Sequence, residues 1–465
     1  MSAQRSRARV GFSLLSVGLL SLAGLWTLPA PASATTPFPK VGQFAQIQHV
    51  VMVMLENRAF DHYFGVYCPA KTAECPMTAN GIPPNTCVPY NTHLPRQGCV
   101  RPYNFTGAQM STNDLPHTWY SSHQAYDFGK MDGFYAAESK QVEAFGHYNG
   151  STVPVYWDIA QQFGLSDAFF SSVLSYSLPN HWYFVAGQSP PSVLNLTQVG
   201  ISVTAKHLYL DEANETQSIE QLAENNSSVS WKYYDYALVN YSKAIQIFGG
   251  NVAGSAYAVW NPLAAKNQSY SLTQHFAPQS DFFSDVTNGT LPNITYMIPS
   301  WPYSDHPPAN VTQGEDWVAS ISNAVARSPY WNNTAIFVTW DEYGGFYDHV
   351  APAQVDANGL AFRVPLLVIS PWTPAGYIGH HPLEFTSLLH FVEWRWNLGC
   401  LTQQDCGAAL PLGFFDFTVH RNPVLFPYSD HAVYPYQPPT DDAGMFDPAT
   451  HFSDAPPPSG TIDWT

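Results

Sequence analysis

The sequence predicts an α/β protein built on one doubly wound, mostly parallel sheet with helices on both faces, in three layers. Two apolar stretches, Val50 to Leu55 and Thr334 to Trp340, each stop abruptly at acidic or amide side chains. A uniformly apolar run of this length is typical of a strand that is buried on both faces of a parallel sheet. Helical patterns alternate with strand-like stretches, and neither a fixed-period repeat nor a clean linker is present.

The remaining elements follow in order along the chain. A helix is expected in residues 155–165, with Gly164 as its stop, followed by a short strand and a tight turn before a second, aromatic helix from Trp182. Further strands are expected at Val229 to Tyr236, Asn293 to Pro299 and Val364 to Ser370, and further helices at Gly314 to Arg327 and Thr386 to Trp396.

Composition divides the 465 residues into three parts. Residues 1–34 have an arginine-rich start, an apolar stretch up to Leu28 and the small-residue exit Ala32-Ser33-Ala34, which predicts a cleaved secretory signal peptide. A membrane anchor is the alternative, and the small-residue exit favours cleavage. Residues 35–420 form the expected main domain, and residues 421–465, rich in Pro, Asp and Tyr, an extended segment packed on it. We expect an exported chain with no integral membrane segment once the signal is removed.

Charge excludes some partners. Only 11% of the residues are charged and the net charge is −17. Nucleic-acid binding needs a basic surface, so a nucleic-acid partner is not expected. Electrostatic attraction to anionic lipid is disfavoured for the same reason.

Six cysteines in an exported chain predict three disulfides. Cys400 and Cys406 are close enough to close a small loop. A structural zinc site is the alternative, but the spacing matches no standard one and the compartment is expected to be oxidising. The other four cysteines leave three pairings open: Cys68, Cys75, Cys87 and Cys99.

Polar side chains follow both apolar strands directly: Glu56 and Asn57 after the first, Asp341 and Glu342 after the second. Ligands of open α/β sheets bind beyond the carboxyl ends of the strands, and oxygen ligands suit a hard divalent cation. Three carboxylates brought together repel one another unless a cation lies between them. Two alternatives are a metal-free carboxylate cluster with raised pKa values, and two strands that are not neighbours at all.

Ser177 is the candidate nucleophile, because it precedes a helix whose N-terminal N–H groups favour phosphate oxygens. The alternative is that its hydroxyl merely caps that helix. The Gly-X-Ser-X-Gly elbow of α/β-hydrolases is absent around it, which disfavours acyl transfer. His117, His306 and His349 lie near Asp or Pro in loops, where a histidine can transfer a proton or hold a phosphate.

Several motifs resemble the bacterial phosphoesterase family, which contains phosphatidylcholine-type phospholipases C and acid phosphatases with an alkaline-phosphatase-like α/β fold. The resemblance covers most of residues 45–400, in the order of the family. The segments that carry it are Glu56-Asn-Arg-Ala-Phe-Asp-His-Tyr-Phe-Gly65, Gly129-Lys-Met-Asp-Gly133, Phe163-Gly-Leu-Ser-Asp-Ala-Phe-Phe-Ser171, Leu178-Pro-Asn180, Asp305-His-Pro-Pro308, Asp341-Glu-Tyr-Gly-Gly-Phe-Tyr-Asp-His349 and Arg363-Val-Pro-Leu-Leu-Val-Ile-Ser-Pro371.

The resemblance implies a phosphoesterase that uses one divalent metal ion, which could be Mg, Ca, Mn or Zn, and a phosphoserine intermediate. The implied metal ligands are Glu56, Asn57, Asp341 and Glu342. The implied catalytic residues are the nucleophile Ser177, Asn180 of the Pro-Asn pair, and the histidines His117 and His306. The substrate would be a small phosphoester or a phospholipid head group, and the oligomeric state stays open.

The chain departs from the family around the nucleophile. Many relatives read Gly-Pro-Thr-X-Pro-Asn-Arg, whereas this chain reads Ser175-Tyr-Ser-Leu-Pro-Asn-His181, so a guanidinium that could bind phosphate is replaced. Ser in place of Thr, and an end soon after the catalytic region, favour a phosphomonoesterase of acid phosphatase type. A phospholipase C is the alternative, with a choline head boxed by Trp119-Tyr120 or Phe346-Tyr347. An inactive secreted binding protein is the second alternative.

Overall fold

The computed structural model describes residues 40–107, 109–194, 211–235, 260–266, 274–355 and 358–427. The expected signal peptide and most of the expected C-terminal segment lie outside these ranges. Of that segment, Phe426 is described, and it is buried with its ring 6.3 Å from that of Phe163.

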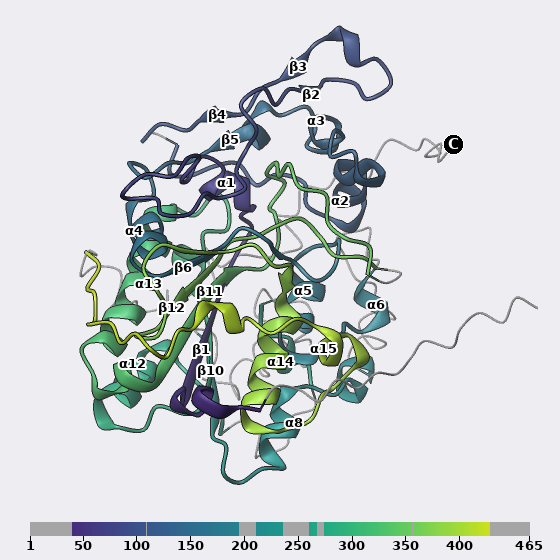
Figure 1. Cartoon of the computed structure of the whole chain (residues 1–465). Helices are drawn as coiled ribbons and strands as arrows, with labels where there is room; N and C mark the ends of the chain where they lie inside the picture. The colour runs from purple at the N-terminus through teal and green to yellow at the C-terminus, as the bar shows by residue number, and fades with distance from the viewer. Residues whose placement is uncertain are drawn as a thin grey trace, which may run out of the picture. The chain divides into compact units, whose positions relative to one another are not determined.

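The core of the described part is an eight-stranded sheet with the order β13-β6-β12-β11-β1-β10-β8-β9 (Figure 1). All neighbouring pairs are parallel except those of β12, which is antiparallel to both β11 and β6. The predicted α/β class with a mostly parallel sheet is confirmed. The strands are β1 (His49–Leu55), β6 (Gly164–Ser166), β8 (Trp231–Asp235), β9 (Phe276–Ala277), β10 (Ile294–Ile298), β11 (Thr334–Trp340), β12 (Leu366–Ile369) and β13 (Tyr377–Gly379).

Helices cover both faces of this sheet. In Figure 1, α4 (Pro154–Gln162), α12 (Gln279–Asn288) and α13 (Val311–Ala326) lie on one side, and α5 (Ser177–Ala186) and α14 (Phe385–Trp396) on the other. Residues of β11 alternate between the two layers, since side chains of a strand point to opposite faces in turn. Phe337 packs on Phe391 of α14 at 5.6 Å between ring centroids, and Trp340 packs on Tyr156 of α4 at 5.0 Å.

Smaller elements complete the described part. The short helices are α1 (Phe60–Phe64), α2 (Trp119–Tyr126), α3 (Phe134–Ala137), α6 (Pro191–Leu194), α8 (Ile219–Glu224) and α15 (Gln403–Gly407). Two-stranded pairings join β2 (Val88–Pro89) with β3 (Cys99–Val100), β4 (Tyr103–Asn104) with β5 (Gly146–His147), and β7 (Phe169–Phe170) with β14 (Leu383–Glu384). The 3-10 turns are Gly42–Gln46, Pro95–Gln97, Asp127–Gly129, Val142–Phe145, Pro262–Ala265, Trp301–Tyr303, Pro329–Asn333 and Leu412–Phe414.

The start of the aromatic helix was predicted wrongly: α5 begins at Ser177, not at Trp182. The side-chain amide of Asn180 donates hydrogen bonds to the carbonyls of Val173, Ser175 and Tyr176. These bonds hold the preceding loop against the helix, so that the first turn begins at Ser177. Pro179 is tolerated within that turn because the N–H that it lacks would have no helical partner there. α13 likewise begins at Val311, before the predicted Gly314, because the side chain of Asn310 caps it.

The structure pairs all six cysteines. Cys400 bonds Cys406 as predicted, and the open choice among the others is settled as Cys68–Cys75 and Cys87–Cys99. Three disulfides indicate an oxidising compartment. Within the described ranges, no helix combines the length and the apolar character needed to cross a bilayer.

Candidate active site

The two apolar strands of the sequence are neighbours in the sheet. β1 and β11 pair in parallel with Leu55 opposite Trp340, so the residues that follow each strand emerge side by side. The N–H of Asp341 donates to the carbonyl of Leu55 at 3.0 Å, and the N–H of Asn57 donates to Oδ1 of Asp341 at 2.7 Å. The alternative of two separate strand ends is therefore excluded.

A close backbone approach fixes the polar loops at these strand ends. Asn57 has a left-handed backbone conformation (φ 62°), which Asn tolerates better than most residues. Gly344 is also left-handed (φ 63°), and a Cβ there would collide with the carbonyl oxygen of Asn57. Its N–H donates to Oε2 of Glu342 at 2.8 Å, which orients that carboxylate. Glycine is thus required at this position for the two loops to meet.

The four predicted metal ligands share an unusual feature: each has one buried side-chain oxygen with no hydrogen-bond donor among the described residues. These atoms are Oε2 of Glu56, Oδ1 of Asn57, Oδ2 of Asp341 and Oε1 of Glu342. Buried polar atoms are normally paired, and oxygens of this kind are the ligands that a divalent cation takes. The residues present therefore fit a divalent metal ion.

Electrostatics point the same way. Burial raises the pKa of Glu56 well above its usual value, and the neighbouring Asp341 carboxylate raises it further. Burial also raises the pKa of Glu342. Neither carboxylate has a lysine or arginine ion-pair partner in the described part of the chain. These carboxyl groups need either a proton or a cation.

Ser177 is the first residue of α5 and is buried against the same cluster. Its side chain lies beside the carboxylate of Glu56, close enough for the hydroxyl to lower the pKa of that group. The N-cap position belongs to Tyr176, and no side chain caps this helix. The hydroxyl therefore faces the carboxylate cluster, and the helix-capping alternative does not describe it. The side-chain amide of Asn180 is hydrogen-bonded to the loop before Ser177, an arrangement that suits a role in positioning the serine.

His117 lies on the other side of the cluster. Its Nδ1 donates a hydrogen bond to the carbonyl of Leu115 at 2.6 Å. In the neutral ring Nε2 then carries no proton, and it accepts a hydrogen bond from Nδ2 of Asn57 at 3.2 Å. The same Nε2 lies 4.0 Å from Oε1 of Glu342. The structure therefore brings His117 next to two of the predicted metal ligands.

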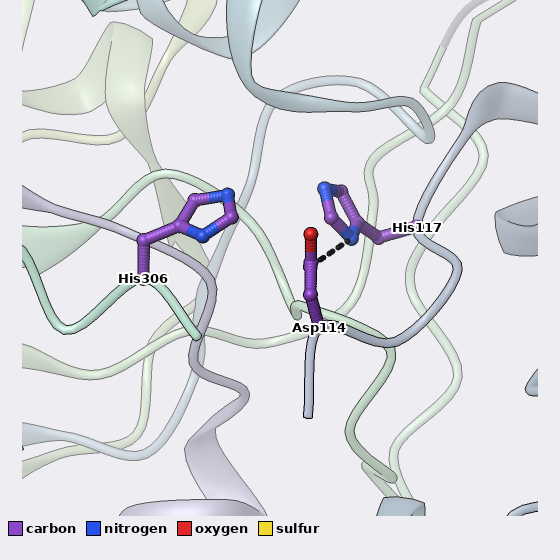
Figure 2. Close-up of side chains that lie close together, drawn as sticks. All are labelled: Asp114, His117 and His306. Carbon is purple, nitrogen blue, oxygen red and sulfur yellow. Dashed lines mark ion pairs between the residues drawn. The ribbon is translucent and has the colours of Figure 1, made fainter. Parts of the chain in front are cut away.

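His306 follows β10, the other neighbour of β1 in the sheet. Figure 2 shows the rings of His306 and His117 turned toward each other, with the Asp114 carboxylate between them. The ring centroids are 5.8 Å apart, and Oδ1 of Asp114 lies 3.6 Å from Nδ1 of His117. Asp114 was not among the predicted site residues. His349 lies in a different cluster, with Asp61 and Arg363.

Comparison with known proteins decides the family. Residues 47–399 match the Phosphoesterase family. The chain belongs to this family.

Curated relatives of this Phosphoesterase-family chain carry phospholipase names. A "Non-hemolytic phospholipase C" of Burkholderia pseudomallei is 27% identical over 438 residues, which is 84% of this chain and 61% of that protein. "Phospholipase C B" of Mycobacterium tuberculosis is 25% identical over 93% of this chain and 88% of its own length. A solved structure from Vibrio parahaemolyticus, titled as a protein in the alkaline phosphatase superfamily, is 10% identical with a TM-score of 0.31, over 53% of this chain and 60% of that one.

Sequence reasoning missed one residue of the cluster, His181. Its Nε2 lies 2.9 Å from Oε1 of Glu56 and 4.0 Å from Oδ2 of Asp341, and the ring is buried. Burial lowers the pKa of His181 to about 4, so the ring is neutral at physiological pH. Two signals were available: His181 replaces the arginine of the family pattern, and it is four residues after Ser177 in a helix, on the same side.

Proposed function

We propose that this chain is an exported, metal-dependent phosphoesterase of phospholipase C type, which cleaves the phosphodiester of a phospholipid and releases the phosphorylated head group. The observation that carries the proposal is the placement of the buried Ser177 at the start of α5, beside Glu56 at the paired ends of β1 and β11 and near four buried oxygens without donors among the described residues. The three disulfides support the export.

In the proposed reaction, Oγ of Ser177 attacks phosphorus and the bond from phosphorus to the leaving oxygen breaks, which gives a phosphoserine. The leaving oxygen takes a proton, and water then attacks phosphorus to release the phosphorylated head group and restore the serine. The carboxylate of Glu56, which lies beside Ser177, is proposed to orient the hydroxyl before the attack. A bound divalent cation would offset negative charge on the attacking oxygen and on the phosphoryl group.

Three other residues have proposed supporting roles. Nε2 of His117 accepts a hydrogen bond and therefore has a lone pair that can exchange a proton near Asn57 and Glu342. His306 faces it and is proposed to hold the phosphoryl group or protonate the leaving oxygen. Asn180 is proposed to position Ser177, because its amide is bonded to the preceding loop.

The choice between diester and monoester rests on two observations. The similar proteins with curated names are called phospholipases C, which favours the diester over the monoester reading that the sequence departures suggested. The chain spans 61% of the Burkholderia protein, so the substrate is a proposal for this chain. Beside His306, the indoles of Trp260 and Trp301 stack with centroids 5.7 Å apart, and such faces bind quaternary ammonium groups. Phe346, which the sequence suggested for this use, instead stacks on His62 in the core.

The test compares two substrates with and without a chelator. We expect the purified chain to release phosphocholine from phosphatidylcholine micelles faster than it releases phosphate from p-nitrophenyl phosphate, and to lose both activities in EDTA. Preference for p-nitrophenyl phosphate would overturn the diester proposal and favour the acid phosphatase. No turnover of either compound by metal-loaded protein would favour the inactive binding protein.

A further inference from the structure

His181 lies where an additional metal ligand would lie, although nothing in the expected ligand set includes it. Ser177 and His181 are one helical turn apart on α5, so both side chains point to the ends of β1 and β11. Nε2 of His181 forms one buried group with carboxylate oxygens of Glu56 and Asp341, with all three ligand atoms within 4.8 Å of one another. Oε2 of Glu56 and Oδ2 of Asp341 are buried and lack donors.

The separations fit coordination to one ion. Atoms that are each about 2.1 Å from a metal ion lie about 3.0 Å apart when they are adjacent at a right angle, and about 4.2 Å apart when opposite. Nε2 of His181 hydrogen-bonds to Oε1 of Glu56 at 2.9 Å and lies 4.0 Å from Oδ2 of Asp341. Both distances fall within the range that a shared ion allows.

The ring of His181 is positioned through Nε2 and not through its second nitrogen. Nδ1 of His181 is buried and has no hydrogen-bond partner among the described residues. Elsewhere in the described chain, the buried His62 and His117 each donate from Nδ1 to a backbone carbonyl, at 2.7 and 2.6 Å. Among the residues that the structure describes, Glu56 and Asp341 are the charged neighbours within ion-pair distance of His181. Its polar partners in the described part of the chain are thus two of the predicted metal ligands.

We propose that Nε2 of His181 is itself a ligand of the metal ion held by Glu56 and Asp341. The inference rests on the proposed function, which supplies the metal site. A nitrogen ligand in place of an all-oxygen set shifts the preference of the site from Mg²⁺ and Ca²⁺ toward zinc and other transition metals. In this chain the replacement of the family's arginine by His181 therefore changes which metal is held.

The first experiment measures binding without any substrate. Metal-free wild-type protein, His181→Asn and His49→Asn are titrated with Zn²⁺ and with Mg²⁺ by calorimetry. His49 is a matched control, because it is a buried histidine at the opposite end of β1 and contacts the carbonyl of Pro292. We expect His181→Asn to bind Zn²⁺ at least about 10-fold more weakly with Mg²⁺ affinity nearly unchanged, and His49→Asn to match the wild type. An equal loss for both metals would show that His181 only positions Glu56, and would overturn the inference.

The second experiment observes the zinc ligands directly, and its main readout comes from the wild-type protein. Zinc-edge X-ray absorption of the loaded wild-type protein should contain the outer-shell scattering of a coordinated imidazole, and this signal should persist in His117→Asn and disappear in His181→Asn. An all-oxygen zinc shell in the wild type would overturn the inference and leave the proposed function intact. Failure of the wild type to bind any divalent metal would overturn both.

Discussion

Two buried acidic clusters follow the same pair of strands, β1 and β11, and they differ in whether they contain a cation of their own. The closed cluster consists of Asp61, Asp348, His349 and Arg363. All four carboxylate oxygens there accept hydrogen bonds, and the guanidinium of Arg363 bonds Asp61 at 2.9 Å and Asp348 at 2.9 and 3.0 Å. Every carboxylate oxygen of this cluster is therefore already paired with a donor.

The open cluster consists of Glu56, Asn57, His181, Asp341 and Glu342. It is equally buried, yet it contains no lysine or arginine within the described chain, and four of its oxygens lack donors. Buried charge is tolerated only when it is paired. The comparison teaches that a guanidinium neutralises the carboxylates of the closed cluster, whereas those of the open cluster lack such a partner among the described residues, and there we propose that a metal ion binds.

The largest expected effect separates the chemistry of the open cluster from its packing. Ser177→Ala should lower turnover of phosphatidylcholine by at least about 10³-fold while the metal stays bound, because the attacking atom is removed and the ligands are not. Phosphocholine release and metal content are measured together. The control is Ser175→Ala, since the hydroxyl of Ser175 only donates to the carbonyl of Leu194. Retained turnover in Ser177→Ala would refute the nucleophile.

The next effect tests the closed cluster. Arg363→Met should destabilise the fold by about 3–5 kcal/mol, because two buried carboxylates lose their cation. Urea unfolding followed by circular dichroism measures the change, with the exposed Arg101→Met as the control. The loss should be the same with and without EDTA. A loss that metal ions reverse would mean that the closed cluster also binds metal.

A matched pair of amide substitutions compares the clusters directly in metal-free protein at neutral pH. Asp348→Asn should cost about 1–3 kcal/mol, since it breaks the bidentate pairing with Arg363. Glu342→Gln should be neutral or stabilising by up to about 1 kcal/mol, because burial raises the pKa of Glu342 and the amide removes an unfavourable buried charge. Thermal unfolding of the two variants and the wild type measures both changes in stability. Equal destabilisation would contradict the distinction between the clusters.

The smallest effect concerns a buried histidine that has neither a carboxylate nor a metal as partner. Burial, and then the Arg58 guanidinium, lower the pKa of His62 well below 6.5. As the pH falls below 6.5, His62 becomes protonated in the unfolded chain but stays neutral in the folded chain. The stability that neutral His62 contributes is therefore present above pH 6.5 and is lost as the pH falls. Between pH 7 and 5.5 the loss is about 1 kcal/mol. His62→Asn should remove this part of the pH dependence in urea titrations, whereas the exposed His93→Asn should keep it.

Much of the fold could be predicted from the sequence because the pattern that encodes it is local. The uniformly apolar runs before Glu56 and Asp341 identified β1 and β11, since only strands covered on both faces carry them. The start of α5 was missed because it depends on Asn180, whose amide folds back onto a loop. Propensity alone does not report such a contact.

The sequence by itself determined the α/β class, the oxygen-rich strand ends and the family, because these follow from composition and from residues that stand next to one another. Only the tertiary structure decided that β1 and β11 pair with Leu55 opposite Trp340, that Arg363 closes one acidic cluster, and that His181 reaches the other. The physical reason is that charge balance inside a protein depends on which distant side chains share a buried space. That sharing is set by strand register and helix packing.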